Sequence, residues 1–258
     1  MLFRSALNPK YDSTTINAIN DIHALYEKKE KQEITFLNTP LLIEFEVFQN
    51  IPIIEISING NEKIKVVFDT GASHSVLSEE YCNKLSIESL QQVKTYTNAE
   101  KASARFRYVN VVGIGDTKIK NVLIASLDFK NLKETLKQYI SKDNVEIGTI
   151  VDEINGVISP RQLFSDETVC LDYEKKKIIV HKGIDEIVDK SDDDYMYLPL
   201  LKTSTDSTMF ALNGKPFSIF TIDTGASTSF VEKEYLEINK IKIPEYSKDK
   251  IFDGVGIT

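Results

Sequence analysis

The chain has 258 residues, of which 41% are hydrophobic, so it can form one large domain or two smaller ones that each bury a core. Its formal net charge of −8 argues against nucleic acid or an anionic membrane as a partner. No apolar run approaches the roughly 20 residues of a membrane-spanning helix, and residues 1–10 lack the apolar core of a secretory signal, so we expect a soluble, cytoplasmic protein unless a signal was removed.

The N-terminal part predicts a helix and then a strand. Within residues 12–33, apolar side chains recur at three-residue spacing, which is typical of an amphipathic helix. We interpret this helix as packing on the outside of the domain that follows it (residues 41–183), with a propeptide that covers a cleft as the alternative. Residues 41–48 alternate and predict a strand that carries Ile43, Phe45 and Val47 on one face.

A predicted hairpin leads into the first of two identical loops. Apolar residues recur at every second position in 54–58 and again at Ile64, Val66 and Phe68, and Asn59-Gly60 between the two segments is a strong turn signal. The second strand runs directly into Asp69-Thr70-Gly71-Ala72-Ser73. The aspartate therefore lies where a buried strand ends, which is a costly place for an ionised carboxylate.

The same pentapeptide returns 154 residues later as Asp223-Thr224-Gly225-Ala226-Ser227. The match extends beyond the loop, because Asn213-Gly214 precedes the second copy as Asn59-Gly60 precedes the first. Three further residues recur at the same offsets: Ser75, Glu80 and Tyr81 return as Ser229, Glu234 and Tyr235. A single Asp-Thr-Gly would be interpreted as a turn cap, but two copies in matched contexts indicate a duplicated structural unit.

Between and around the copies, the remaining signals are weaker. Residues 78–85 and 131–140 predict short helices, and the acidic residues 184–195 predict a solvated linker rather than a metal site. The two cysteines, Cys82 and Cys170, are expected to be buried free thiols, although they could pair. The three histidines are scattered, so neither a metal site nor a Ser-His-Asp triad is indicated.

The duplicated loops resemble those of aspartic proteases of the pepsin and retropepsin type, whose bacterial members share the order of segments seen here. In that family two Asp-Thr-Gly loops, one from each lobe or subunit, meet at a two-fold axis. Three later segments fit the family's lobe: the hydrophobic-Gly segment 154–158, a short turn or helix at 160–164, and a hairpin over 169–180. Ser159 stands where the family often has a second glycine.

The resemblance implies an all-β-dominated, bilobal acid-protease fold with short helices and an added N-terminal helix. It divides the chain into a helical extension (1–40), a first lobe (41–183), an acidic linker (184–195) and a second lobe (196–258). The counterpart of Gly156 would fall near position 310, about 87 residues after Asp223. We therefore expect an incomplete second lobe and a longer natural protein.

The resemblance also implies the roles of the loop residues. Asp69 and Asp223 would hold a water between them as a catalytic dyad, with no cofactor and no metal. Thr70 and Thr224 would join the loops by hydrogen bonds across the lobes. Gly71 and Gly225 would let backbone groups reach the aspartates and the substrate.

A flap, a hairpin folded over the cleft, would fall at residues 95–105. Asn98 and Ala99 would lie near its tip and Tyr96 would face the substrate, and Gly254 and Gly256 occupy the equivalent place after the second loop. A solvated hairpin with no role in substrate binding is an equally good interpretation of residues 95–105. Gly113-Ile114-Gly115 lies too far from Asp69 to be the flap and predicts a strand or bend.

The implied function is peptide-bond hydrolysis by a single-chain aspartic endopeptidase acting on peptide or protein substrates. Because Ala72 and Ala226 replace a hydroxyl residue that many pepsin-like enzymes have, we expect a raised pKa for the dyad and a near-neutral optimum. One alternative is a catalytically inactive peptide-binding or scaffolding module with a protease-derived fold. Another is a homodimer in which the first lobes of two chains supply both aspartates.

Overall fold

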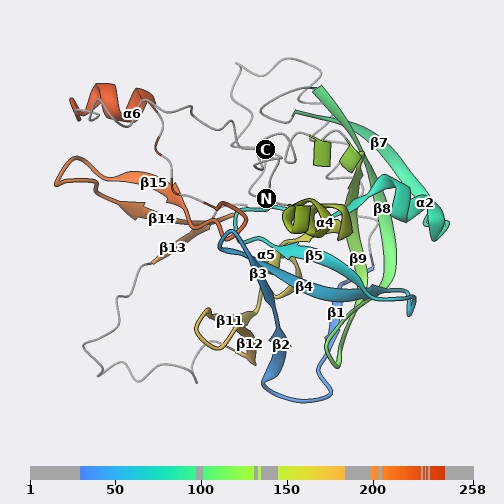
Figure 1. Cartoon of the computed structure of the whole chain (residues 1–258). Coiled ribbons are helices and arrows are strands. Elements are labelled where there is room, and N and C mark those ends of the chain that lie inside the picture. The colour runs from blue at the N-terminus through green and yellow to red at the C-terminus, as the bar shows by residue number, and fades with distance from the viewer. Residues whose placement is uncertain are drawn as a thin grey trace.

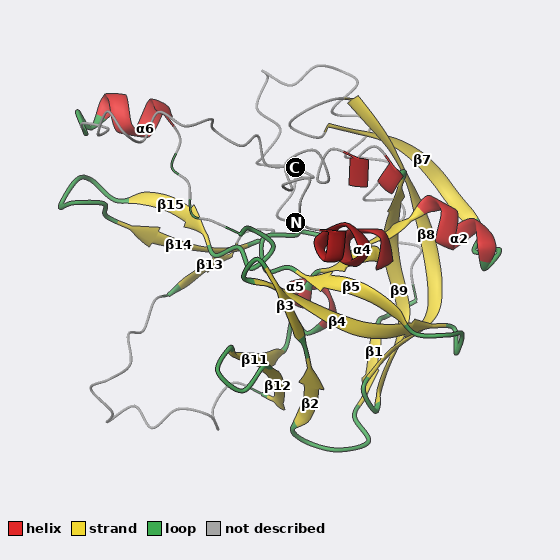
Figure 2. Cartoon of the chain, in the orientation of Figure 1, coloured by secondary structure: helices red, strands yellow, loops and turns green. Residues whose placement is uncertain are grey.

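The computed structural model describes residues 30–96, 101–130, 133–134, 145–183, 199–202, 205–227, 229, 231 and 233–241 (Figure 1). Strands dominate these residues and the helices are short (Figure 2). The prediction of an all-β-dominated fold with short helices is therefore confirmed. Within the described ranges, no helix combines the length and the apolarity needed to cross a membrane. The predicted N-terminal helix falls almost entirely on residues 1–29, outside the described residues.

The largest sheet has nine strands in the order β1-β9-β6-β10-β5-β4-β8-β7, with β3 attached to β4. Strand β9 pairs with β8 as well as with β6, so the sheet closes on itself into a barrel. Its strands are β1 (Glu33–Thr35), β3 (Glu46–Phe48), β4 (Ile51–Ile58), β5 (Ile64–Phe68), β6 (Val76–Ser78), β7 (Ser89–Tyr96), β8 (Lys101–Ile114), β9 (Thr117–Leu127) and β10 (Ile154–Ile158).

The end of the predicted N-terminal extension is a strand rather than a helix. Strand β1 pairs antiparallel with β9, and Glu33 lies opposite Lys120. Ile34 packs against the barrel core while Glu33 and Thr35 point outward. The prediction of a helical extension is therefore wrong at residues 33–35. Pairing with β9 provides partners for the backbone hydrogen-bonding groups there, and the single inward side chain, Ile34, attaches the strand to the core.

Residues 41–48 form two strands instead of one. Strand β2 (Leu41–Glu44) pairs with β12, whereas β3 pairs with β4 in the large sheet. The chain changes sheets at Phe45, whose N–H donates to the Lys176 carbonyl at 3.1 Å. Ile43 and Phe45 are buried and Val47 is 38% exposed, so the prediction that all three lie on one face of a single strand is wrong at Val47, which belongs to β3.

The hairpin that leads to the first loop forms as predicted. Strand β4 buries Ile54, Ile56 and Ile58 and pairs antiparallel with β5. The turn between them holds Asn59 at φ 52° and Gly60 at φ 76°, the left-handed conformations of a type I′ turn. Alternation along both strands therefore fixes which side chains enter the barrel.

Strand β10 runs between β5 and β6, parallel to the first and antiparallel to the second. Glycine is required in its centre, because a Cβ at Gly156 would lie 2.5 Å from the Val76 carbonyl oxygen. The chain continues into α5 (Pro160–Leu163) and then into the hairpin of β11 (Glu167–Asp172) and β12 (Lys177–Lys182), which forms a three-stranded sheet with β2.

Two helices lie beside the barrel. The helix predicted at 78–85 is α2 (Glu79–Lys84), and Ser78 caps it by accepting the Tyr81 N–H. Helix α4 (Val145–Glu153) precedes β10 and was not predicted. Of the helix predicted at 131–140, Lys133 and Glu134 are helical, and the rest lies outside the described residues.

The second half repeats the elements around the first loop at an offset of 154 residues. Strands β13 (Leu200–Lys202), β14 (Asp206–Phe210) and β15 (Ser218–Thr221) form a three-stranded sheet, and α6 (Lys233–Ile238) follows. The register of β14 on β15 is that of β4 on β5, since Ser207 faces Thr221 as Ile53 faces Val67. The turn at Asn213-Gly214 also has positive φ angles, 52° and 68°.

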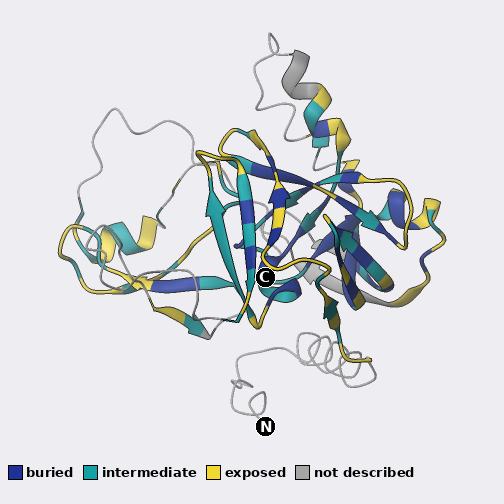
Figure 3. Cartoon of the chain, turned by 90° about the horizontal axis from the view of Figure 1, so that it is seen from below, coloured by how far each residue is buried: buried dark blue, intermediate teal, exposed yellow. Residues whose placement is uncertain are grey.

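Burial differs between the halves (Figure 3). The barrel encloses a core around Phe68, Leu77 and Ile124, all of which are buried. On the second-half sheet, several large apolar side chains are exposed: Leu200, Met209, Phe210, Phe217 and Ile219. The predicted linker and domain boundaries stay predictions, because residues 184–198 and 242–258 are not described.

Candidate active site

The first aspartate is held by the strand pairing beneath it. Asp69 follows β5, and its N–H donates to the Ile158 carbonyl of β10 at 3.0 Å, which extends the parallel pairing by one residue. Phe68, directly before it, is completely buried. The carboxyl group therefore projects from a rigid strand end.

In the loop that follows, backbone N–H groups point back toward the carboxylate of Asp69. Oδ1 of Asp69 accepts the N–H groups of Gly71 at 2.7 Å and Ala72 at 3.1 Å. In the second copy, Oδ1 of Asp223 accepts the N–H of Gly225 at 2.8 Å. The identical sequence thus orients both carboxyl groups in the same way.

The two loops meet so closely that each glycine lies against the aspartate of the other copy. A Cβ added to Gly71 would lie 2.5 Å from Cγ of Asp223, and a Cβ added to Gly225 would lie 2.5 Å from Cγ of Asp69. Only glycine fits at such distances. The structure therefore brings both aspartates, 154 residues apart in sequence, to one point between the halves.

Reciprocal hydrogen bonds join the loops behind the carboxyl groups. The Thr70 N–H donates to Oγ1 of Thr224 at 3.1 Å, and the Thr224 N–H donates to Oγ1 of Thr70 at 3.0 Å. Each hydroxyl then donates to the carbonyl directly before the opposite aspartate, Ile222 at 2.6 Å and Phe68 at 2.7 Å. All four loop residues predicted to support the dyad thus lie together with the aspartates.

The surroundings of Asp69 favour the protonated form of its carboxyl group. The pKa of Asp69 is raised from 3.8 to about 7, first by burial, then by the negative charge of Asp223 and by a hydrogen bond between the two carboxyl groups. The N–H groups of Gly71 and Ala72 act in the opposite direction. We expected the raised pKa from the missing hydroxyl at Ala72 and Ala226; the structure attributes it first to burial and the neighbouring carboxylate.

Ser159, a departure from the family pattern, supports the first loop. Its buried hydroxyl donates to the Ala72 carbonyl at 2.6 Å and accepts the Gln162 N–H at 3.3 Å, which caps α5. Its own N–H donates to Oγ of Ser75 at 3.1 Å. The serine thus links the strand end of β10 to the loop that carries Asp69.

Gln162 is a supporting residue that the sequence analysis missed. Its Oε1 accepts the Ser75 N–H at 2.6 Å and its Nε2 donates to the Leu123 carbonyl at 2.5 Å. The pattern Ser-Pro-Arg-Gln at 159–162 is a helix-capping signal that could have drawn attention to this segment. Its long-range contacts, however, become visible only in the folded chain.

The region predicted as a flap is a hairpin. Strands β7 and β8 form a long two-stranded ribbon at one side of the barrel, and Tyr96 pairs with Lys101 at its described end (Figure 1). Asn98 and Ala99 lie outside the described residues, as do Gly254 and Gly256, and the structure does not describe the Tyr96 side chain. A role of this ribbon in substrate binding stays a prediction.

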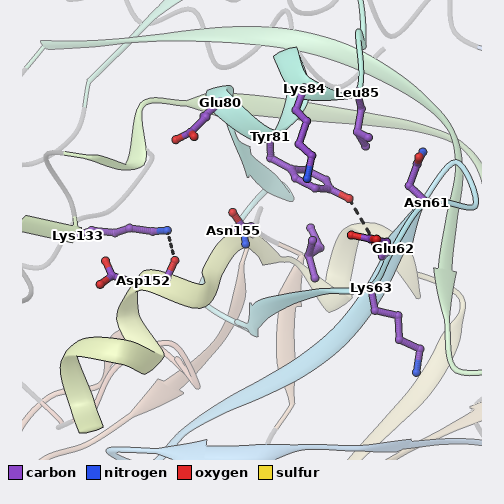
Figure 4. Close-up of a pocket in the computed structure, with 11 residues that line it drawn as sticks. Asn61, Glu62, Lys63, Glu80, Tyr81, Lys84, Leu85, Lys133, Asp152 and Asn155 are labelled. Carbon is purple, nitrogen blue, oxygen red and sulfur yellow. Dashed lines mark hydrogen bonds between the residues drawn. The ribbon is translucent and has the colours of Figure 1, made fainter. Parts of the chain in front are cut away.

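A separate pocket of about 700 Å³ lies between the β4–β5 turn, α2 and the end of α4 (Figure 4). Its charged lining includes Lys63, Lys84 and Glu80, and the Tyr81 hydroxyl donates to the Glu62 carbonyl at 3.5 Å. No residue of the duplicated loops lines it. This pocket is therefore distinct from the paired carboxyl groups.

Other candidates from the sequence do not join the site. Cys82 is buried and Cys170 is half-buried, and both are free thiols, so the expectation of burial is right for Cys82 alone. Among the described residues, no group of three or more His, Cys, Asp or Glu side chains is placed to hold a metal ion. The acidic run at 192–194 lies outside those residues.

Comparison with known proteins agrees with the loop sequence. Residues 54–137 match the family described as gag-polyprotein putative aspartyl protease, a range that contains the first loop. A solved structure, the retropepsin-like aspartic protease from Rickettsia conorii, is 22% identical over 59% of this chain and 94% of its own length, with a TM-score of 0.37. A search among curated proteins gave no match. The resemblance to retropepsin-type aspartic proteases is confirmed by the family match.

Proposed function

Because residues 54–137 match the family of gag-polyprotein putative aspartyl proteases, we propose that the chain is an aspartic endopeptidase that uses Asp69 and Asp223 as its catalytic pair. One observation carries the proposal. Each loop glycine lies so close to the opposite aspartate that a Cβ would come within 2.5 Å of its Cγ, so the two carboxyl groups share one location. Two carboxyl groups in that arrangement can act together on one water molecule.

The proposed reaction needs no covalent intermediate. The ionised carboxylate takes a proton from the water, which attacks the scissile carbonyl carbon. The protonated carboxyl group donates to the carbonyl oxygen as it becomes an oxyanion, and a proton then passes to the leaving amine. Since two carboxylates this close cannot both ionise, the pair retains one proton and titrates as a unit.

The two carboxyl groups lie in unequal settings. Asp69 is half-buried, and burial is the largest cause of its raised pKa, whereas Asp223 is exposed. Burial disfavours the charged form of a carboxyl group. Burial therefore favours the protonated form at Asp69, while the pair as a unit retains one proton and activates the water.

The substrate class follows from the same proposal. An extended peptide would lie across the junction of the two loops, with its scissile bond beside the two carboxyl groups. The β7–β8 ribbon is our candidate for the segment that closes over it. The proposed substrates are accordingly unstructured stretches of peptides or proteins.

The direct test is cleavage of an unstructured protein substrate by the full chain. We expect cleavage to be inhibited by pepstatin and to be lost in both Asp69→Asn and Asp223→Asn. Asp166→Asn, a change at an exposed aspartate outside both loops, is the matched control and should retain activity.

Two outcomes would redirect the proposal. Loss of cleavage in Asp69→Asn with full activity in Asp223→Asn would favour a homodimer of first halves. Peptide binding without cleavage by a folded wild-type chain would favour the scaffolding alternative and overturn the enzyme assignment.

A further inference from the structure

At one position beside the loops, the two halves carry different residues. Asp206 lies 17 residues before Asp223, and the residue 17 positions before Asp69 is Pro52. These positions correspond in the fold, because β14 repeats β4 at the 154-residue offset with the same register. The duplicated halves therefore present different chemistry at equivalent places.

Asp206 makes contacts across the junction with both its backbone and its side chain. Its N–H donates to the Thr70 carbonyl of the first loop at 3.2 Å, and its own carbonyl accepts the Ile222 N–H at 2.7 Å. Its Oδ1 accepts a hydrogen bond from Nη1 of Arg161 at 2.8 Å, and Nη2 of Arg161 donates to the Leu201 carbonyl at 3.4 Å. Arg161 belongs to α5 of the first half, so this ion pair spans the halves.

The ion pair is partly shielded from water. The side chains of Arg161 and Asp206 are 29% and 21% exposed. A charge-assisted hydrogen bond in such a setting discriminates between partners more strongly than a fully solvated pair. The arginine also contacts a backbone carbonyl of β13, so its position depends on the second half being docked.

Proline at the equivalent position can make neither contact. Pro52 has no N–H to donate to the loop carbonyl of a partner, and it has no carboxylate to accept a bond from Arg161. If two first halves paired with each other, both contacts would be missing on both sides of the axis. Each Arg161 would then lose its carboxylate partner, and each Thr70 carbonyl its donor.

We propose that Asp206 and Arg161 determine which partner the first half accepts, namely the second half of the same chain and not a second copy of the first half. The inference goes beyond the proposed enzymatic function and does not depend on it. It concerns which two copies of the duplicated loop pair, and it implies that the pair forms within a single chain.

The test uses engineered thiols that report pairing directly. Nδ2 of Asn50 donates to the Ser227 carbonyl at 3.5 Å, and both residues are exposed. In a dimer of first halves, the residue facing Asn50 would be Ser73 of the other chain. With a short bismaleimide, the Asn50→Cys/Ser227→Cys variant should form a crosslink within one chain. The Asn50→Cys/Ser73→Cys variant should give no covalent dimer. The single Asn50→Cys variant controls for the native thiols.

The contribution of the ion pair is then measured in the Asn50→Cys/Ser227→Cys background along a urea series. Asp206→Pro, which installs the first-half residue, should weaken docking about tenfold and lower the urea concentration at which crosslinking is half lost. Arg161→Asp and Asp206→Arg should each do the same, and the charge-exchanged double variant should recover most of the loss.

Three results would overturn the proposal. The first is an Asp206→Pro chain that crosslinks like its parent along the whole urea series. The second is covalent dimer from Asn50→Cys/Ser73→Cys as readily as intrachain product from Asn50→Cys/Ser227→Cys. The third addresses the case in which Asp206→Pro fails to fold: absence of recovery in the charge-exchanged double variant would then contradict a pairing role.

Discussion

The hydroxyl of Thr70 accepts the backbone N–H of Thr224 at 3.0 Å, and the hydroxyl of Thr224 accepts the N–H of Thr70 at 3.1 Å. Each hydroxyl also donates to the carbonyl directly before the aspartate of the opposite loop, at Ile222 and at Phe68. Every one of these bonds crosses from one half of the chain to the other. The position of each carboxyl group therefore depends on the loop that carries the other.

Removing one hydroxyl should loosen both loops. In Thr224→Val the side chain keeps its shape, but the Thr70 N–H and the Phe68 carbonyl lose their partner. Leaving such groups unpaired costs about 1–3 kcal/mol. We expect urea denaturation to show a loss of this size, with activity reduced more strongly. Thr224→Ser keeps the hydroxyl and should retain most of the stability and most of the activity. Equal losses of stability and activity in Thr224→Val and Thr224→Ser would contradict the role of the hydrogen bonds.

The glycines of the loops should tolerate no side chain. In Gly71→Ala the new Cβ would lie 2.5 Å from Cγ of Asp223, and in Gly225→Ala it would lie equally close to Cγ of Asp69. Such a contact is relieved only if the aspartate side chain turns away or the loops separate, and either change displaces a carboxyl group, so we expect loss of cleavage in both variants. Gly60→Asn is the control: nothing lies within 4 Å of the added Cβ, and asparagine accepts a positive φ. Full activity of Gly71→Ala would contradict the close approach.

Local sequence signals predicted the elements that depend on local chemistry. Alternation and the Asn-Gly turn gave β4 and β5, and the duplicated pentapeptide gave the two aspartates with their threonines and glycines. The break at Phe45 could not be predicted, because the same alternating pattern continues through it. Only the pairing of β2 with β12 and of β3 with β4 places the two parts in different sheets.

The support of the site escaped prediction for a similar reason. Ser159 and Gln162 contact Ala72 and Ser75, more than 80 residues earlier in the chain, and Arg161 contacts Asp206 in the other half. No periodicity marks residues that meet only after the barrel has closed. The duplication could have pointed to Asp206, since it replaces Pro52 in an otherwise matched unit, but its partner could not be read from the sequence.

Ser159 should contribute to stability although it replaces a glycine that the family often has. Ser159→Ala leaves the Ala72 carbonyl without the donor that lies 2.6 Å away and removes the cap of α5. Loss of a cap and of a buried hydrogen bond each cost about 1 kcal/mol, so we expect a total near 2 kcal/mol in urea denaturation. Ser165→Ala, at an exposed position shortly after α5, should cost almost nothing. An unchanged urea midpoint of unfolding in Ser159→Ala would show that water replaces the hydroxyl.

The pH dependence of cleavage should have an alkaline limit near neutrality. The pKa of Asp69 is raised to about 7, and the proposed reaction requires the pair to retain one proton. Activity should therefore fall as pH rises through about 7, when that proton is lost. The measurement is kcat/KM across pH 3 to pH 9, in the range where the protein stays folded. A profile that peaks below about pH 3 would contradict both the raised pKa and the near-neutral optimum expected from the sequence.

The same proton should make the folded state less stable as pH rises. The pKa of Asp69 is about 7 in the folded chain against 3.8 ordinarily, so between these values the folded state binds more protons than the unfolded state. The free energy of unfolding should then decrease with pH, with a slope from this group approaching about 1.4 kcal/mol per pH unit. Its stabilising contribution is complete below about pH 4 and lost as pH passes 7.

Asp69→Asn isolates this contribution, because the amide is neutral at every pH and its oxygen can still accept the N–H groups of Gly71 and Ala72. The difference in unfolding free energy between Asp69→Asn and the wild type should grow in favour of the variant from pH 4 to pH 7 and then level off. Asp166→Asn, at an exposed carboxylate, should run parallel to the wild type. A difference between Asp69→Asn and the wild type that stays constant across this range would mean that the carboxyl pair holds no extra proton, and the proposed sharing between Asp69 and Asp223 would fail with it.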